Sequence, residues 1–146
     1  MLLIETLTSE HLTQLECLEK EVFLKGAYSS QQLKEILEDN NYLKLGILEN
    51  QKIVAYILIL KGLDVNDLIK VGVINKYRRQ HLATRLMEAV IELDKQKKIL
   101  LEVNENNQQA ISFYQKLNFK INNVRKSYYN NNDNALIMVL NHKQKS

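Results

Sequence analysis

The strongest constraint on the fold of this chain is the segment 53–60, the longest uninterrupted apolar run in the sequence. The run is far shorter than the ~20 residues that a membrane-spanning helix needs, and its length suits a strand. A strand that is apolar on both faces must be covered on both faces. We therefore expect a sheet with helices on both sides, in a chain whose 146 residues make one ordinary globular domain.

The hydrophobic pattern predicts elements in the order β-α-α-β-β-β-α-β-α-β-β, a mixed α/β (α+β) arrangement. Strands are predicted over residues 2–7, 42–48, 52–60, 69–74, 99–103, 120–126 and 135–140. The inward faces of the four helices are predicted as Leu12, Leu15, Leu18 and Val22; Leu33, Ile36 and Leu37; Leu82, Leu86, Ala89, Val90 and Leu93; and Ala110, Phe113, Tyr114 and Leu117. Ser29 with Gln32 has the form of a capping box. Asn106 or Asn107 can cap the last helix, and Asn118 stands where a helix end favours left-handed backbone.

The charge and the cysteine content narrow the possible functions. A net charge of +3 and a pI near 8.9 allow a polyanionic ligand such as a nucleotide, but they are too weak to indicate a nucleic-acid groove. The one cysteine, Cys17, excludes an internal disulfide, and its apolar helical context predicts a small buried side chain. The three histidines are too scattered to indicate a metal site. The first residues lack the basic region of a signal peptide, so we expect a cytoplasmic protein.

A strand followed by a basic helix start is the first candidate binding feature. The segment Val71-Gly72-Val73 closes a predicted strand, and Arg78 and Arg79 precede an amphipathic helix. The first N–H groups of a helix have no partner within it, and the helix dipole is positive there, so an anion binds readily. The arrangement favours a pyrophosphate, with a solvated basic helix start as the alternative.

Two ionisable side chains are candidates for chemistry. Glu102 lies in the apolar segment 99–103, where a buried carboxylate would need a partner or a function. An exposed position on the outer face of the strand is the alternative. Tyr114 shares an apolar helix face with Phe113 and Leu117, and the alternative there is a core tyrosine with a bonded hydroxyl.

Together these pieces resemble the GNAT acetyltransferase superfamily, in which a strand, an anion-binding helix start, a strand with a glutamate and an Asn-capped helix with a tyrosine follow one another. Three segments resemble its RimI-type branch, the ribosomal-protein alanine N-acetyltransferases: Leu100-Leu101-Glu102-Val103-Asn104, Phe113-Tyr114-Gln115-Lys116-Leu117-Asn118-Phe119 and Arg125-Lys126-Ser127-Tyr128-Tyr129. The resemblance is strong over residues 71–140 and weak before them. It implies the GNAT fold, a central and mostly antiparallel sheet of about seven strands with four helices on both faces. It also implies a single domain over residues 1–146, with residues 141–146 as a polar tail.

The resemblance further implies an enzyme that takes an acetyl group from acetyl-CoA without a metal. Glu102 would be the general base, Tyr114 the general acid and Asn107 a further CoA contact. Pantetheine would lie along Val71, Gly72 and Val73, and the pyrophosphate would be held by Arg79, Gln80, His81, Leu82, Ala83 and Thr84. The acceptor groove would be lined by Tyr28, Tyr128 and Tyr129.

Two departures from the family pattern bear on binding. His81 occupies the place of the first glycine in the family's R/Q-x-x-G-x-G/A motif. We expect it to adopt ordinary helical backbone, to leave acetyl-CoA binding intact and to donate to a phosphate oxygen, more strongly when protonated. The segment Asp133-Asn134-Ala135 replaces the branch's Glu-Asp-Ala, which removes one carboxylate near the expected acceptor end.

The resemblance implies that the acceptor is the N-terminal amine of a protein, the alanine of a small-subunit ribosomal protein above all. An α-amine has a pKa near ~7.8, so roughly a tenth of it is neutral at pH 7, against under ~0.1% of a lysine side chain. A single glutamate is then an adequate base. The alternatives are a small-molecule amine as the acceptor, or a non-catalytic CoA-binding adaptor on the same fold. We expect no membrane partner and no direct nucleic-acid partner.

Overall fold

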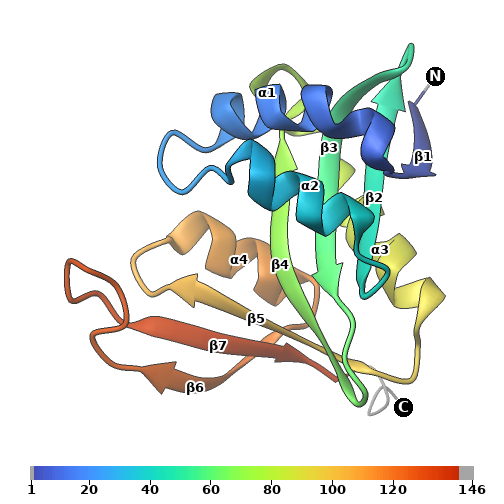
Figure 1. Cartoon of the computed structure of the whole chain (residues 1–146). Coiled ribbons are helices and arrows are strands. Elements are labelled where there is room, and N and C mark those ends of the chain that lie inside the picture. The colour runs from blue at the N-terminus through green and yellow to red at the C-terminus, as the bar shows by residue number, and fades with distance from the viewer. Residues whose placement is uncertain (1, 142–146) are drawn as a thin grey trace. The chain divides into compact units, whose positions relative to one another are not determined.

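The computed structural model describes residues 2–141 as seven strands, four α-helices and two short 3₁₀ segments (Figure 1). Backbone hydrogen bonds connect the strands in the order β1-β2-β3-β4-β5-β7-β6. The pairs β1–β2, β2–β3, β5–β7 and β6–β7 are antiparallel and β4–β5 is parallel. The predicted order of elements and the mostly antiparallel sheet are therefore confirmed. Of the predicted tail 141–146, residues 142–146 lie outside the described residues.

The boundaries of the elements follow the predicted ones closely, with one exception. The strands are β1 (Leu2–Thr6), β2 (Tyr42–Glu49), β3 (Lys52–Leu60), β4 (Val65–Val73), β5 (Lys98–Asn104), β6 (Lys120–Arg125) and β7 (Ala135–Leu140). The helices are α1 (Leu12–Val22), α2 (Ser30–Glu38), α3 (Leu82–Leu93) and α4 (Gln108–Lys116). The exception is β4, which begins at Val65 and not at residue 69. The second and third residues of β4 are Asn66 and Asp67, residue types that are depleted in strands.

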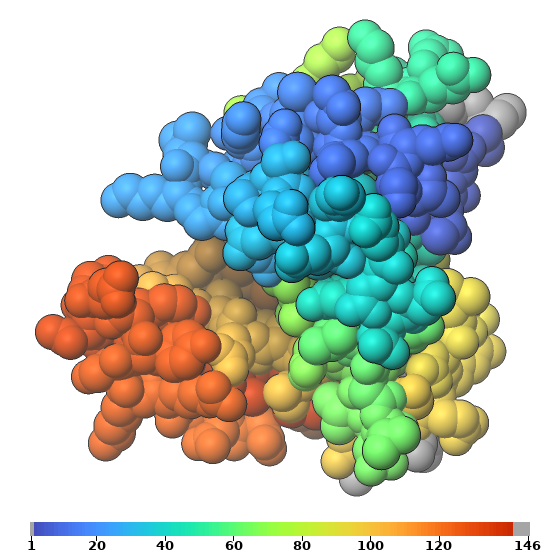
Figure 2. Space-filling view, in the orientation of Figure 1, coloured from blue at the N-terminus to red at the C-terminus, as the bar shows by residue number. Residues whose placement is uncertain are grey.

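Contacts divide the chain into two compact units, and β4 runs through both. The first unit comprises the residues up to Lys61 together with Ile69–Leu93. In it, α1 and α2 cover one face of β2 and β3, and α3 covers the other (Figure 1). Figure 2 shows α1 and α2 packed side by side at the surface. The strand β3 is buried on both faces, as its apolar run predicts. One domain over residues 1–146 stays a prediction.

The second unit comprises Gly62–Leu68 and the residues from Asp94 onward. In it, β5 lies between the beginning of β4 and β7, and β6 forms the outer edge. Alternate residues of β5, namely Ile99, Leu101 and Val103, are buried, and Glu102 points to the other face. All six residues of β6 are exposed.

The predicted capping signals are present, and a tight turn connects β2 to β3. Two residues, Asn50 and Gln51, connect β2 to β3 with positive φ angles of 51° and 69°, as a type I′ hairpin requires. Ser29 Oγ accepts from the amide of Gln32 (3.1 Å), whose side-chain oxygen accepts from the amide of Ser29 (2.8 Å). Asn118 has the left-handed φ of 74° expected at a helix end. These local signals are confirmed because they depend on neighbours in sequence alone.

Two expectations about burial are wrong. Cys17 is exposed, because the buried side of α1 is formed by Leu15, Leu18 and Glu19. Leu93, the last residue of α3, is 64% exposed, whereas Leu82, Leu86 and Val90 of the same stripe are buried. Among residues 2–141, no helix has the length and apolar character to cross a membrane.

Candidate active site

The basic helix start lies between the end of β4 and the first turn of α3. The side chains of Arg78, Arg79, Gln80 and His81 are exposed there, Leu82 is buried, and Ala83 and Thr84 are half-buried. The carbonyl of His81 accepts from the amide of Arg85 (3.0 Å), which starts the hydrogen-bond ladder of the helix. The guanidinium groups and the first N–H groups of this helix make its start suitable for an anion.

The backbone of this segment turns left-handed twice. Arg79 has φ 69° and His81 has φ 58°. The expectation that His81 adopts helical backbone is wrong, because residue 81 immediately precedes the helix and its φ is positive. This conformation costs an L-residue about 1–2 kcal/mol and favours glycine. Left-handed residues in such segments turn successive N–H groups to one side, which makes an anion-binding concavity.

Replacing His81 by glycine is expected to raise the free energy of unfolding by about 0.5–1 kcal/mol, because glycine adopts positive φ without a Cβ clash but loses more chain entropy. Urea unfolding measures the change. His81→Ala is the matched control, since it removes the imidazole and keeps the Cβ, and it should not stabilise. Equal stability of the glycine and alanine variants would contradict the idea that the positive φ of residue 81 destabilises the protein.

The packing of the sheet explains why residue 72 is a glycine, independently of any ligand. A Cβ at this position would lie 2.9 Å from Cε1 of Tyr56, whose ring is fully buried. The glycine therefore lets β4 pack closely against Tyr56. Val71 and Val73, on the other face of β4, are half-buried.

Glu102 lies on the more open face of β5 and is paired. Its Oε1 accepts from Nη1 of Arg125 at 3.0 Å, with 29% of the glutamate side chain and 54% of the arginine side chain exposed. Arg125 is the last residue of β6, and its guanidinium lies 5.7 Å from the ring of Tyr128. Glu102 is thus an exposed residue on the outer face of β5, the alternative to a buried carboxylate, and it is paired with Arg125, a residue to which sequence reasoning gave no role.

Tyr114 lies on α4 in an aromatic cluster. Its ring centroid is 5.3 Å from that of Phe113 and 5.6 Å from that of Phe119. Burial raises the pKa of Tyr114 to about 12, so the phenol stays protonated from neutral to strongly alkaline pH. Asn107 caps the same helix, because its Oδ1 accepts from the amide of Ala110 (3.2 Å).

The connection between β6 and β7 carries two predicted acceptor residues, one of which lies at Arg125, the partner of Glu102. The rings of Tyr128 and Tyr129 meet edge to face at 5.2 Å. Burial, and then the negative charge of Glu102, raises the pKa of the Tyr129 phenol. Within the second unit, the structure thus gathers Glu102, Arg125 and the tyrosine pair.

The residues Asp133 and Asn134 hold this connection to the end of β5. Asp133 Oδ2 accepts from Asn104 (3.0 Å), and the amide of Asn134 donates to Glu105 (2.7 Å). Hydrogen bonds from Asn104 and then Asn106 lower the pKa of the Asp133 carboxyl. Asp133 and Asn134, which stand in place of the family's Glu-Asp pair, therefore have a structural role in this chain.

In the first unit, Tyr28 lies at a buried charge cluster that the sequence did not predict. Glu19 is fully buried and accepts from Nζ of Lys70 (2.8 Å), from the amide of Tyr28 (2.7 Å) and from the hydroxyl of Tyr56. The ammonium of Lys70 also lies 3.9 Å from the centroid of the Tyr28 ring. Burial, and then the charge of Glu19, raises the pKa of the Tyr28 phenol. The only signal in the sequence was a glutamate on the apolar side of α1, three residues before Val22.

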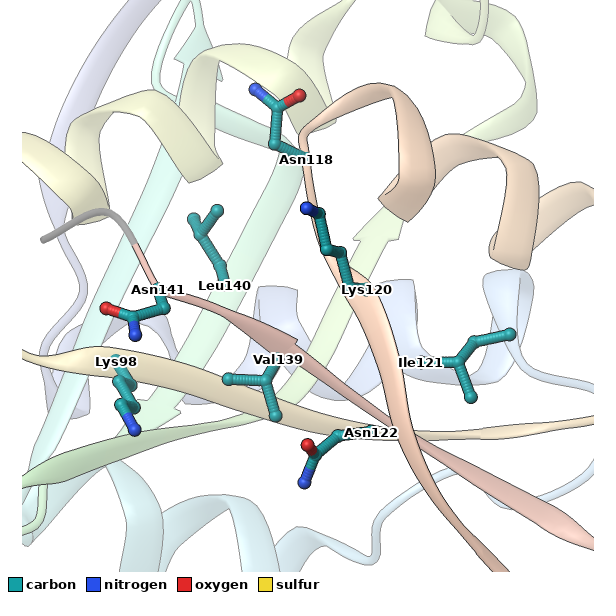
Figure 3. A pocket seen from close by; sticks show the side chains of 8 residues that line it. All are labelled: Lys98, Asn118, Lys120, Ile121, Asn122, Val139, Leu140 and Asn141. Atoms are coloured by element: carbon teal, nitrogen blue, oxygen red, sulfur yellow. The ribbon is translucent and has the colours of Figure 1, made fainter. Parts of the chain in front are cut away.

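The pocket in Figure 3 contains none of the predicted site residues. It lies in the second unit and is lined by Lys98, Asn118, Lys120, Ile121, Asn122, Val139, Leu140 and Asn141. Of the predicted site residues, Tyr28 and residues 71–84 belong to the first unit; Glu102, Asn107, Tyr114, Tyr128 and Tyr129 belong to the second. Among residues 2–141, no group of three or more His, Cys, Asp or Glu side chains could hold a metal ion.

Comparison with known proteins relates the chain to acetyltransferases. The model of the Acetyltransferase (GNAT) family matches residues 8–119. The ribosomal protein bS18-alanine N-acetyltransferase of Escherichia coli strain K12 is 33% identical over 109 residues, which are 70% of this chain and 74% of that protein. The crystal structure of the E. coli ribosomal-protein-S18-alanine N-acetyltransferase matches with a TM-score of 0.86 and 28% identity, over 96% of this chain and 93% of that one.

Two further proteins extend the comparison. An N-alpha-acetyltransferase of Saccharolobus solfataricus is 39% identical over 85 residues, which are 56% of this chain. The match spans 48% of that protein, about half of its length. Arabidopsis thaliana NAA60, crystallised with acetyl-CoA, has a TM-score of 0.84 over 96% of this chain and 98% of that one. Its identity is 14%, so this likeness concerns the fold alone.

Proposed function

The chain belongs to the GNAT acetyltransferase family, and from this we propose that it transfers the acetyl group of acetyl-CoA to the N-terminal amine of a protein, the alanine of a small-subunit ribosomal protein above all. The observation that carries the proposal is the 33% identity to the E. coli bS18-alanine N-acetyltransferase over 74% of that protein. The exposed Cys17 thiol suits a reducing cytoplasm.

In the proposed reaction, the residues of the first unit hold the cofactor. The pyrophosphate binds at Arg79, Gln80, His81, Leu82, Ala83 and Thr84, where exposed basic residues, positive φ angles and a helix start occur together. Pantetheine lies along the backbone of Val71, Gly72 and Val73, and Asn107 of the second unit makes a further contact with CoA. Tyr28, Tyr128 and Tyr129 contact the acceptor.

The chemistry is attack of a neutral amine on the thioester carbonyl. A C–N bond forms, the C–S bond breaks, and CoA leaves as a thiolate. Glu102, held by Arg125, accepts a proton from the amine. Tyr114, whose raised pKa keeps it protonated, gives its proton to the thiolate and regains one from solvent. No step requires a metal.

Acetylation of a small panel of peptides tests the acceptor. We expect a peptide that begins with alanine, taken from a small-subunit ribosomal protein, to have a higher kcat/KM than spermidine or free lysine. Part of the difference comes from the amine, because an α-amine is far more often neutral at pH 7 than a lysine side chain. A higher kcat/KM for spermidine would contradict a protein acceptor and favour a small-molecule enzyme.

Acetyl-CoA is expected to raise the Tm of the protein. A ligand that binds only the native state stabilises it by about 2.7 kcal/mol at a concentration a hundred times Kd. Thermal scans with and without millimolar acetyl-CoA measure this shift. The variant Arg79→Ala should show a smaller shift, while Lys52→Ala, on an exposed residue of β3, serves as the matched control. Absence of any shift of Tm in the unaltered protein would contradict binding of acetyl-CoA. It would also contradict the alternative of a non-catalytic adaptor that binds CoA.

A further inference from the structure

A second carboxylate lies beside Glu102 on the same face of the sheet. In the parallel pairing of β4 with β5, Asp67 lies opposite Leu100. Alternate residues of a strand share a face, so Asp67, Leu100 and Glu102 point to one side. The residues that precede Asp67 and Leu100 in their strands, Asn66 (2% exposed) and Ile99 (1%), point into the buried side. Diagonal neighbours in a sheet lie about 7–8 Å apart, within reach of long side chains.

The two carboxylates have different surroundings. Glu102 is paired with Arg125 of β6, and its negative charge is one of the causes that raise the pKa of the Tyr129 phenol. Asp67 is half-buried, and among residues 2–141 no cation or hydrogen-bond donor contacts its carboxylate. Burial, and then the negative charge of Glu102, raises the pKa of Asp67. Lys98 shares this face of β5 but lines the pocket of Figure 3.

The charges of this cluster suit an ammonium ion. When ionised, Asp67, Glu102 and Arg125 together carry one more negative charge than positive. An α-amine enters mostly as an ammonium with three N–H protons, and the amide product keeps one. Two protons must therefore leave the nitrogen, one before the attack and one as the C–S bond breaks. A single carboxylate cannot hold both at once.

We propose that Asp67 is a second catalytic carboxylate, which binds the ammonium of the acceptor beside Glu102 and takes the first of its two protons. The free amine then forms the C–N bond, Glu102 takes the second proton, and the CoA thiolate leaves with the proton of Tyr114. Both carboxylic acids return their protons to solvent. The proposal rests on the proposed function, since it needs an amine that is acetylated.

The pH dependence of Asp67→Asn tests this role. At about pH 6.5 we expect kcat/KM for an alanine-initiated peptide to fall about 10- to 100-fold, as for a lost hydrogen bond to a charged group. At about pH 9.5 the deficit should shrink to within about threefold, because an amine with a pKa near ~7.8 then arrives neutral. Glu102→Gln should keep its deficit at both values. Asp64→Asn, an exposed aspartate just before β4, is the matched control and should match the unaltered protein.

The outcomes separate this inference from the proposed function. A deficit of Asp67→Asn that is equal at the two pH values would make Asp67 a structural residue, and an unchanged kcat/KM would remove it from the reaction. Either result, with turnover by the unaltered protein, overturns the role of Asp67 alone. If the unaltered protein acetylates no amine, both proposals fail. A shift of Tm with acetyl-CoA that is the same in Asp67→Asn and in the unaltered protein shows that the variant is folded and binds its cofactor.

Discussion

Replacing Glu102 by glutamine or Tyr114 by phenylalanine is expected to lower kcat by about 10²–10⁴, the usual contribution of a positioned acid or base. Glutamine keeps an oxygen that can accept from Arg125 but cannot take a proton from the amine. Phenylalanine keeps the ring contacts with Phe113 and Phe119 and loses only the hydroxyl. Steady-state kinetics with a peptide acceptor measure both effects, and folding and acetyl-CoA affinity should change little.

Two conservative variants serve as matched controls for this loss. Glu88→Gln removes an exposed carboxylate from α3, and Tyr42→Phe removes the hydroxyl of a half-buried tyrosine at the start of β2. Both should leave kcat within about twofold, as expected of positions away from the chemistry. Because the pKa of Tyr114 is about 12, its acid form persists to high pH, so titration of Tyr114 should not lower kcat between about pH 7 and 10. Near-normal turnover in Tyr114→Phe would leave Tyr114 as a core tyrosine.

Replacing Lys70 by methionine is expected to lower the free energy of unfolding by about 3–5 kcal/mol, because it leaves the buried carboxylate of Glu19 without its counter-ion. The ammonium of Lys70 also donates to the carbonyl of Gly26 (2.7 Å) and lies 4.2 Å from the centroid of the Phe23 ring. The same change therefore loosens the connection between α1 and α2 that carries Tyr28. Urea unfolding followed by circular dichroism measures the loss.

A double variant distinguishes an uncompensated charge from lost packing. Glu19→Gln combined with Lys70→Met removes both charges, and the neutral amide can still accept from the Tyr56 hydroxyl. We expect the pair to recover at least half of the stability that Lys70→Met loses, since neighbouring charges are strongly coupled. Lys52→Met, on an exposed lysine of β3, should stay within about 0.5 kcal/mol of the unaltered protein. A double variant less stable than the single one would contradict the charge argument.

The sequence predicted best what depends on near neighbours. The capping box at Ser29, the left-handed Asn118 and the doubly buried β3 all follow from local pattern, and the structure confirms them. The start of β4 was missed because Asn66 and Asp67 are poor strand formers, yet they pair with β5. That omission also hid Asp67, whose position beside Glu102 exists only once the two strands are aligned.

The electrostatic partners could not be predicted, because they come from distant parts of the chain. Glu19 and Lys70 are separated by 51 positions, and Glu102 meets Arg125 from another strand. Nothing in the local sequence distinguishes these lysine and arginine side chains from solvated ones. The positive φ of His81 was missed for a different reason. A histidine favours ordinary backbone, and only the path of the chain into α3 imposes the left-handed turn.

The outer strand β6 leaves one edge of the sheet open to pairing with another polypeptide. Its edge is unpaired at the end of the strand order, and Ile121 and Val124 are 48% and 42% exposed. Such an edge invites strand addition and aggregation, which charged side chains and bulges oppose. Lys120 and Arg125 begin and end β6, and a shift of register between Ile121 and Asn123 interrupts its ladder. The charged ends and the interrupted ladder of β6 therefore oppose the addition of a further strand at this edge, including an extended peptide that reaches the protein as an acceptor.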